Sequence, residues 1–521
     1  MDVVNDFESL ATARLLDFFG SGTRWYRSLW NPGLILSLRE ILEASHAVQT
    51  SILSESALTF AVSSVLRTAP FDSGVGDRTR LKALQEALST KLRFGGLDYL
   101  AAKQLTEEIE SKYLSHWAAH LMKPSNPNPE RVARAIAAHL LDLGFNSDYL
   151  HRWWTYRLHY EQPRRSLHEI IMEAHALAST PLRPFTVLVA FESVPPRKFG
   201  RPGGWTDAPA VSQWLQANGF DNSGVRQRGG VLLQVEARDG RAAADAAAEE
   251  VENLAARARV ATANELRYLP QVWVAGEPAP YSIGQRSRGL NVGALIRENV
   301  VYTKAGTEEA VDAAFEMLAP LQASSPIAAI AAGWAAVEAL LSEPNDRGGA
   351  ADRLASIVAC SLPRAELTVL SYVLEKQDAD MAAALANITE NRDRAAVVAR
   401  AILAGQPLSL TGWADKAALW RMMRLLHRPG EVLEDIRSYA TATFRRLYRQ
   451  RNLVLHGGRT NPVALRACLR TAAPLVGAGM DRIAHSYYVN KRHPLATAAQ
   501  ARIAITTIAG QDPLHCVDLL S

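Results

Sequence analysis

The chain has 521 residues, of which 48% are hydrophobic and 21% charged, a balance typical of a folded globular protein and not of a disordered or fibrous one. At roughly 150 residues per domain, this length predicts about three domains. The formal net charge of +4 is small for the length, so the chain does not coat nucleic acid over its whole surface. Any affinity for nucleic acid must come from local clusters of basic residues.

The first 180 residues are predicted to form a helical N-terminal domain. Apolar residues recur there at three- and four-residue steps, which indicates helices. The proline-rich segment KPSNPNPE, residues 123–130, predicts a loop between two helices. A further helix is expected over Glu130–Leu143, and Gly144 is expected to end it.

Residues 181–305 are predicted to form a small α+β domain, because the pattern changes from helical periodicity to short apolar runs. PFTVLVAFESV, GGVLLQVEARDG and LPQVWVAG are typical of strands. The alanine-rich stretch RAAADAAAEEVENLAARARV, between the second and third of these, predicts a helix. This domain carries no catalytic signature, and we regard it as a candidate sensor.

The rest of the chain returns to helical patterns, so the predicted fold class is mainly α with a small α+β middle domain. Residues 306–495 are expected to form a helical bundle of four or more members, with an insertion near residues 375–410. Residues 496–521 are expected to be a C-terminal tail.

Cysteine usage and hydropathy indicate a cytoplasmic protein that does not enter a membrane. Cys360, Cys468 and Cys516 stand singly, so they form neither a disulfide framework nor a zinc knuckle. The N-terminus carries acids where a secretory signal needs basic residues, and no apolar run reaches the roughly 18 residues of a spanning helix. The nearest candidate, PIAAIAAGWAAVEALL, contains Glu338 and is typical of a buried bundle helix.

The most informative stretch for chemistry is FRRLYRQRNLVLHGGR, which begins at Phe444 and places Arg451 and Asn452 ahead of His456. Spacing alone proves little, because 57 Lys and Arg with 13 His produce roughly one R-x4-H pair by chance. A second copy, Arg134 and His139, lies mid-helix among alanines, and we interpret it as helix surface and core edge.

The surroundings of the Arg451–His456 motif favour a site for RNA. Metal-free cleavage needs a base for the 2′-OH proton, an acid for the leaving 5′ oxygen and positive charge for the phosphorane. One histidine and one arginine supply half of this, and two chains with facing motifs would supply the rest. Gly457 is expected to be the left-handed cap of the helix. The basic residues expected to bind RNA are Arg445, Arg446, Arg449 and Arg459.

Two segments of the chain resemble a known superfamily. LYRQRNLVLHGG resembles the signature of HEPN ribonucleases, and GWAAVEALL resembles an earlier bundle helix in the Apea-like and abortive-infection branch. The resemblance covers about residues 306–490. It implies a homodimer or higher homo-oligomer that cleaves RNA without metal or cofactor, leaves a cyclic phosphate, and serves in anti-phage defence or as a toxin. A phage-derived trigger or regulator is expected to act on the N-terminal region.

Residue by residue, the resemblance gives Arg451 and His456 the catalytic roles and Asn452 the polar position beside the arginine. It gives Glu338 and Tyr448 supporting roles. One departure concerns the branch paired with nucleotidyltransferase antitoxins, which has a tyrosine two residues after the histidine. Gly458 stands there in this chain, so silencing by tyrosine modification is not expected.

Three alternatives stay open beside the ribonuclease. Arg451 and His456 could be ordinary residues of a helix end, in a non-catalytic bundle that dimerises or binds nucleic acid. HEIIMEAH, residues 168–175, could suggest a zinc site, but its histidines lie about two helical turns apart and cannot share one ion. The aromatic and basic stretch at residues 149–165 could contact single-stranded nucleic acid, although aromatics at helical spacing are more often core.

Overall fold

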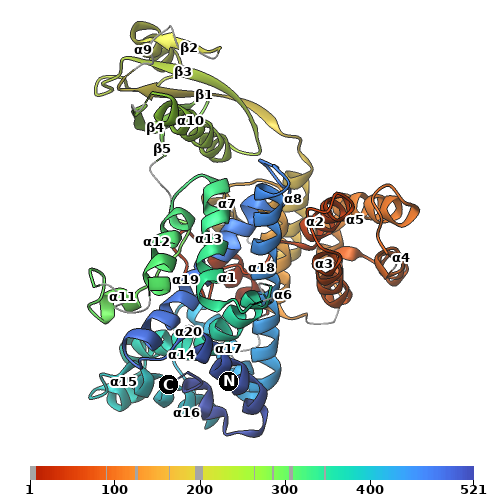
Figure 1. The fold of residues 1–521 in the computed structure, drawn as a ribbon, viewed down its shortest axis with the longest axis vertical. Helices are drawn as coiled ribbons and strands as arrows, with labels where there is room; N and C mark the ends of the chain where they lie inside the picture. The colour runs from red at the N-terminus through yellow and green to blue at the C-terminus, as the bar shows by residue number, and fades with distance from the viewer. Residues whose placement is uncertain are drawn as a thin grey trace. The chain divides into compact units, whose positions relative to one another are not determined.

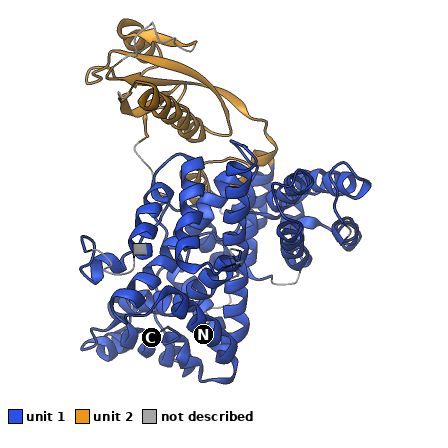
Figure 2. Ribbon diagram, in the orientation of Figure 1, with its two compact units in different colours: residues 1–139, 161–175, 288–521 blue, residues 140–160, 176–287 orange. Residues whose placement is uncertain are grey.

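The computed structural model describes residues 7–89, 91–123, 127–163, 165–193, 203–262, 265–283, 287–303, 309–344, 346 and 348–520. The chain divides into two compact units, shown in different colours in Figure 2. Unit 1 comprises residues 1–139, 161–175 and 288–521, and unit 2 comprises residues 140–160 and 176–287. The division differs from the predicted boundaries, because most of the N-terminal helical region belongs to the same unit as the C-terminal bundle.

The first 180 residues are helical, as predicted (Figure 1). The helices are α1 (Phe7–Phe19), α2 (Leu34–Gln49), α3 (Glu55–Thr68), α4 (Arg78–Ser89), α5 (Leu97–Leu121), α6 (Pro129–Asp142), α7 (Ser147–His159) and α8 (Leu167–Ser179). Short 3₁₀ turns, η2 (Ala69–Phe71) and η3 (Ser73–Val75), follow α3. Gly144 adopts a φ of +94° just beyond α6, which confirms the predicted stop.

The C-terminal part of unit 1 is a helical bundle. Its helices are α11 (Ala294–Arg297), α12 (Glu309–Gln322), α13 (Pro326–Leu341), α14 (Gly349–Gln377), α15 (Ala379–Leu385), α16 (Asn391–Leu403), α17 (Trp413–His427), α18 (Pro429–Leu455), α19 (Leu465–Tyr488) and α20 (Pro494–Thr507). The predicted insertion contains α15 and α16. The prediction of a C-terminal tail over residues 496–521 is wrong, because Ile505, Cys516 and Leu520 lie in the hydrophobic core of the bundle.

Helix α14 is the central helix of this bundle and packs against α16, α18, α19 and α20. Its 29 residues continue through Pro363. Among the described residues it is the one helix long and apolar enough to cross a membrane by length and composition, and most of that window is buried inside the unit. The sequence had singled out α13 instead.

The N-terminal segment joins the core of the bundle through large side chains and buried ion pairs. Tyr26 and Trp30 belong to the same apolar cluster as α13, α14 and α18. Arg27 Nε donates to Glu366 on α14 over 2.8 Å, and Arg421 on α17 pairs with the same fully buried carboxylate. Burial would raise the pKa of Glu366, but the two guanidinium groups outweigh it and hold that pKa below its usual range. These pairs explain why residues before 140 do not form a separate domain.

Unit 2 contains the α+β fold that the sequence predicted. Its strands are β1 (Arg183–Phe191), β2 (Trp205–Asp207), β3 (Gly229–Ala237), β4 (Tyr268–Val274) and β5 (Tyr281–Ser282), and its helices include α9 (Ala208–Ala217) and α10 (Gly240–Thr262). The sheet has the order β2-β3-β1-β4-β5, with every neighbouring pair antiparallel. The predicted strands and the alanine-rich helix are confirmed.

Alternation along β1 sorts its side chains onto the two faces of this sheet, because successive residues of a strand point to opposite sides. Val187, Val189 and Phe191 form a core cluster with alanines of α10. Leu188 and Ala190 pack with α9 on the other face. Both faces are therefore covered by a helix, which accounts for a continuous apolar run in place of a polar alternation.

Candidate active site at the end of α18

Helix α18 ends at Leu455, and a glycine turn closes it. The backbone N–H groups of His456 and Gly457 both donate to the carbonyl of Asn452, over 2.9 and 3.2 Å. The left-handed residue is Gly458, with a φ of +62°, and not Gly457 as the sequence analysis expected. Gly457 is small for a different reason: a Cβ there would lie 2.6 Å from the Leu453 carbonyl oxygen and 3.2 Å from Ile52.

The three predicted catalytic residues meet at this helix end. One terminal nitrogen of Arg451, Nη1, lies 3.0 Å from Nε2 of His456 and donates to Oδ1 of Asn452 over 3.0 Å. A guanidinium has no acceptor, so Arg451 must be the donor to the imidazole, and Nε2 carries no proton in this arrangement. His456 is exposed and Arg451 half-buried, whereas Asn452 is buried. The site therefore has an accessible pair held in place by a buried amide.

The predicted supporting residues, Glu338 and Tyr448, lie on two neighbouring helices. Helix α13 packs against α18, and its fully buried Trp334 lies with its ring centroid 5.0 Å from that of Tyr448. Tyr448 is half-buried and stands one turn before Asn452 on α18. Glu338 is half-buried on α13, one turn after Trp334. The structure thus brings the tryptophan and tyrosine of the two predicted motifs together.

Two of the four predicted RNA-binding arginines are buried, which corrects their assignment. Arg446 and Arg449 are 5% and 3% exposed, and both pair with Glu40 of α2, at 2.8 and 3.1 Å. Burial would raise the pKa of Glu40, but the two guanidinium groups outweigh it and hold that pKa below its usual range. Since neither guanidinium is open to solvent, these arginines fix α18 to α2 and do not form an RNA-binding surface.

The other two basic residues are accessible but also paired. Arg445 forms an ion pair with Asp352 and lies over the ring of Phe60, 4.4 Å from its centroid. Arg459 Nη1 donates to Glu43 of α2 over 2.8 Å, and its Nη2 lies 2.7 Å from His46 Nδ1. Their side chains are about one third exposed. They can reach a phosphate only by sharing or exchanging these carboxylates.

The residues that sequence reasoning missed lie on α2 and just after it. Glu40, Glu43 and Ile52 all contact the last turns of α18 or the glycine turn. Within LREILEASH the two glutamates look like ordinary helix-surface acids, and no local pattern shows that Glu40 is 2% exposed. Their partners lie about four hundred residues away in the chain, so no local signal could have identified them.

An open cavity of about 610 Å³ adjoins Tyr448. Its walls come from the start of α3, the start of α14 and the middle of α18. Among the described residues the Tyr448 hydroxyl has no hydrogen-bond partner. The polar residues that line the cavity are Ser54, Ser56, Asp346, Arg445, Tyr448 and Arg449. Because Ile52 contacts Gly457 and Ser54 follows two residues later, this cavity lies beside the same α2–α3 junction that borders the Arg451–His456 pair.

Over the residues it describes, the structure does not turn the other candidate sites of the sequence, at residues 149–165, residues 168–175 and the cysteines, into recognisable sites. His168 lies in the first turn of α8, and its Nδ1 is 2.9 Å from the Ser166 hydroxyl. No cluster of three or more metal-binding side chains occurs among the described residues. On α7, Trp154 is fully buried, whereas Tyr156 and Tyr160 are exposed and stacked on each other. Burial raises the pKa of all three cysteine thiols to about 12, which does not suit a nucleophile.

No protein-family model matches the chain, and neither curated proteins nor solved structures give a match to it.

Proposed function

We propose that the chain is a metal-independent endoribonuclease of the HEPN type that acts in anti-phage defence or as a toxin. One observation carries this proposal: Arg451, Asn452 and His456 meet at an accessible helix end, with the guanidinium 3.0 Å from Nε2 of the imidazole. A cation beside an unprotonated imidazole nitrogen is the pairing that 2′-OH attack on a phosphodiester requires. The contact between Trp334 and Tyr448, one from each of the two resembling segments, adds support.

The contact between Arg451 and His456 defines how substrate would engage. In the free protein the lone pair of Nε2 accepts the Arg451 hydrogen bond. A phosphate oxygen that takes over this donor leaves Nε2 free to accept the proton of the 2′-OH. The 2′ oxygen then bonds to phosphorus, the bond to the 5′ oxygen breaks, and the products are a 2′,3′-cyclic phosphate and a 5′-hydroxyl. Arg451 stabilises the negative charge that develops on the phosphorane.

The departing 5′ oxygen needs a proton from a second group. Among the described residues, His456 is the histidine that contacts Arg451, whereas His46 is engaged by Arg459. We therefore propose that a second copy of the chain faces the first and donates from its own His456. Two Arg451 side chains would then hold the same phosphate. The cavity beside Tyr448 gives a place for a neighbouring nucleotide, because Arg445 and the Tyr448 hydroxyl line it one to two helical turns from the motif.

A His456→Ala variant tests this function. We expect cleavage of bulk RNA in the presence of a chelator to fall by about 10²- to 10⁴-fold, because the imidazole is the proton acceptor. The measurement is gel analysis of RNA fragments and of their cyclic-phosphate ends, alongside growth of cells that express each protein. Equal cleavage by wild type and variant would sink the ribonuclease proposal and favour a bundle that only binds or dimerises.

His139→Gln is the matched control, because it removes the histidine of the other R-x4-H pair. His139 is 4% exposed, so the control should reduce thermal stability and leave the cleavage rate per folded molecule unchanged. Circular dichroism on each variant separates loss of folding from loss of chemistry.

A further inference from the structure

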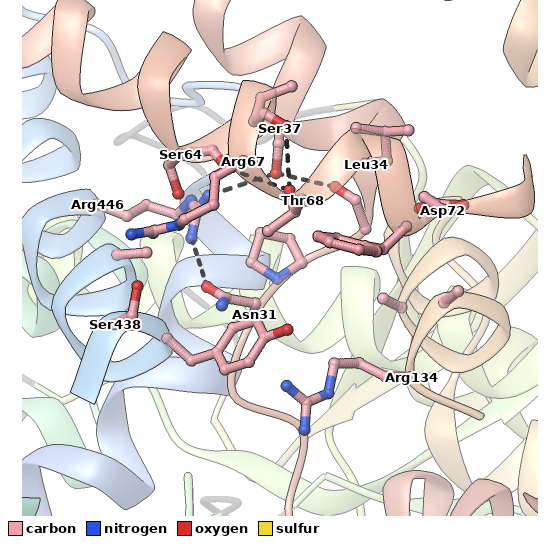
Figure 3. Close-up of a pocket in the computed structure, with 18 of the residues that line it drawn as sticks. Asn31, Leu34, Ser37, Ser64, Arg67, Thr68, Asp72, Arg134, Ser438 and Arg446 are labelled. Atoms are coloured by element: carbon pink, nitrogen blue, oxygen red, sulfur yellow. Dashed lines mark hydrogen bonds between the residues drawn. The ribbon is translucent and has the colours of Figure 1, made fainter. Parts of the chain in front are cut away.

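A second cavity, away from the helix end, lies between α3, α6, α18 and the segment that leads into α2. It measures about 440 Å³ and belongs entirely to unit 1. Figure 3 shows its polar lining from several elements: Asn31 and Ser37 ahead of and within α2, Ser64 and Arg67 on α3, Arg134 on α6, and Ser438 and Arg446 on α18. Rings of Phe60, Phe71 and Tyr439 complete the walls. The size falls in the range of small-molecule sites.

Several polar groups around this cavity are already satisfied by the protein. Arg446 donates to Glu40, Asn31 and Ser37. The Asp72 carboxylate accepts hydrogen bonds from the Tyr113 hydroxyl, the Trp117 indole and the Gly74 backbone. Arg446 and Asp72 therefore hold the protein together. The groups that could bind a ligand belong to other residues.

The groups without partners are mainly donors and cations. Among the described residues, the guanidinium groups of Arg67 and Arg131 have no hydrogen bond or ion pair, although Arg131 lies 4.7 Å above the Phe71 ring. Arg134 pairs with Glu130 through Nη2, but its Nε is buried with no partner. The side-chain hydroxyls of Ser64 and Ser438 likewise have no partner among the described residues. The wall formed by α3 and α6 therefore offers free hydrogen-bond donors, although Asp72 and Asp435 lie close enough to act electrostatically on Arg131.

Four carboxylates also line the cavity. Glu40 pairs with Arg446, Asp72 lies just after α3, and Glu431 and Asp435 lie on the first turns of α18. Glu431 lies 3.5 Å from the exposed Arg428. Figure 3 shows Arg67 and Arg446 directed to one side of the cavity together with Ser64 and Ser438, and Arg134 on the other side. The free guanidinium of Arg67 and the two hydroxyls lie on the side where the engaged Arg446 adds positive charge, an arrangement that fits a tetrahedral anion.

We infer that this cavity binds a small phosphorylated organic molecule of about mononucleotide size. Its phosphate lies against Arg67, Ser64 and Ser438, near the positive charge of Arg446. Its organic part lies along Phe60, Tyr439 and Ala442, which line the same space. A cavity of this size with walls from four segments suits a small molecule better than a polymer. The inference stands on these residues alone and does not depend on the ribonuclease proposal.

The test uses the full chain with adenosine monophosphate and inorganic pyrophosphate as probes. We expect each to raise the midpoint of thermal unfolding, because a ligand that binds only the folded state stabilises it. Adenosine, which has no phosphate, should give no shift. Arg67 is exposed, so Arg67→Gln should fold normally and weaken probe binding about tenfold or more in calorimetry. Arg502→Gln, which removes an exposed arginine of α20, should bind like wild type.

Three outcomes would overturn the inference. One is no shift with either probe, another is equal binding by wild type and Arg67→Gln, and the third is a shift with a single-stranded RNA oligonucleotide only. A second variant, Ser64→Asp, introduces a negative charge into the cavity while leaving every arginine in place. It should abolish the shift with both probes, and retained binding in a folded Ser64→Asp protein contradicts the assignment.

Discussion

The two R-x4-H pairs of this chain have the same spacing and opposite surroundings. On α6, His139 is 4% exposed and its ring centroid lies 4.6 Å from that of Tyr113. Arg134 pairs with Glu130 and lies over the rings of Trp30 and Tyr439. On α18, by contrast, the arginine and histidine contact each other and His456 is exposed.

Helix geometry explains the difference. Residues five apart on a regular helix lie about 140° apart around its axis, so their side chains normally point away from each other. Helix α6 continues to Asp142, beyond His139, and its arginine is engaged one turn earlier. No helical turn follows His456, so the long Arg451 side chain can reach it across the open end of the helix. Position relative to the helix end therefore matters more than the spacing itself.

The strongest test of this comparison removes the arginine of each pair. Arg451→Gln should lower RNA cleavage by about 10²- to 10³-fold, since the phosphorane loses its charged donor. Its thermal stability should stay near wild type, because the side chain is only half-buried. Arg134→Gln should do the reverse: it removes the ion pair with Glu130 and the contacts with two rings, and costs about 1 to 3 kcal/mol of folding free energy.

RNA cleavage assays and urea unfolding of the two variants decide between these expectations. If Arg134→Gln lost cleavage as strongly as Arg451→Gln at equal folded fraction, the two pairs would not differ in function, and the assignment to α18 would be wrong.

Local patterns predicted much of the fold. Short apolar runs predicted the strands of unit 2, and glycine stops predicted the ends of α6 and α18. The residues of the candidate site could also be selected, because the signal is confined to the segment from Tyr448 to Gly458. The environment of the neighbouring arginines could not be predicted. Arg446 and Arg449 look like a basic face, and only the contact with Glu40 on α2 shows that they are core residues.

The domain division failed for a similar reason. The break in composition near residue 180 is real, and it marks the start of β1. However, Arg27 and Trp30 join the C-terminal bundle through Glu366 and Thr443. Contacts between residues more than three hundred positions apart leave no periodicity in the sequence. The shift in composition therefore predicted where the sheet begins, but not that the helices before and after it belong to one unit.

The surroundings of the α6 pair should also respond to pH. The Tyr113 ring that packs on His139 donates its hydroxyl to Asp72 over 2.8 Å. Burial raises the pKa of this carboxyl to about 6, above its ordinary value near 4. The folded state therefore binds more protons than the unfolded state between about pH 4 and 6, and the stability contribution of Asp72 falls as the pH rises through this window.

Unfolding free energies of wild type and Asp72→Asn at pH 4 and pH 7 isolate this effect from the other carboxylates. Relative to the variant, wild type should lose about 1 to 2 kcal/mol between the lower and the higher pH. A constant difference between the two proteins across this range would show that Asp72 keeps an ordinary pKa.

The smallest expected effect concerns the glycines that follow the two helices. Gly458 and Gly144 both adopt a positive φ, of +62° and +94°, so alanine at either position should cost about 1 kcal/mol of stability. Neither added methyl group meets an atom closer than 4.0 Å, so the cost is conformational.

The two substitutions should differ in their effect on cleavage. Gly458 lies two residues from His456, so Gly458→Ala should move the helix end slightly and lower RNA cleavage by about two- to fivefold. Gly144 lies five residues beyond His139, so Gly144→Ala serves as the matched control. An equal loss of cleavage in both variants would mean that general destabilisation, and not the geometry of the α18 end, governs activity.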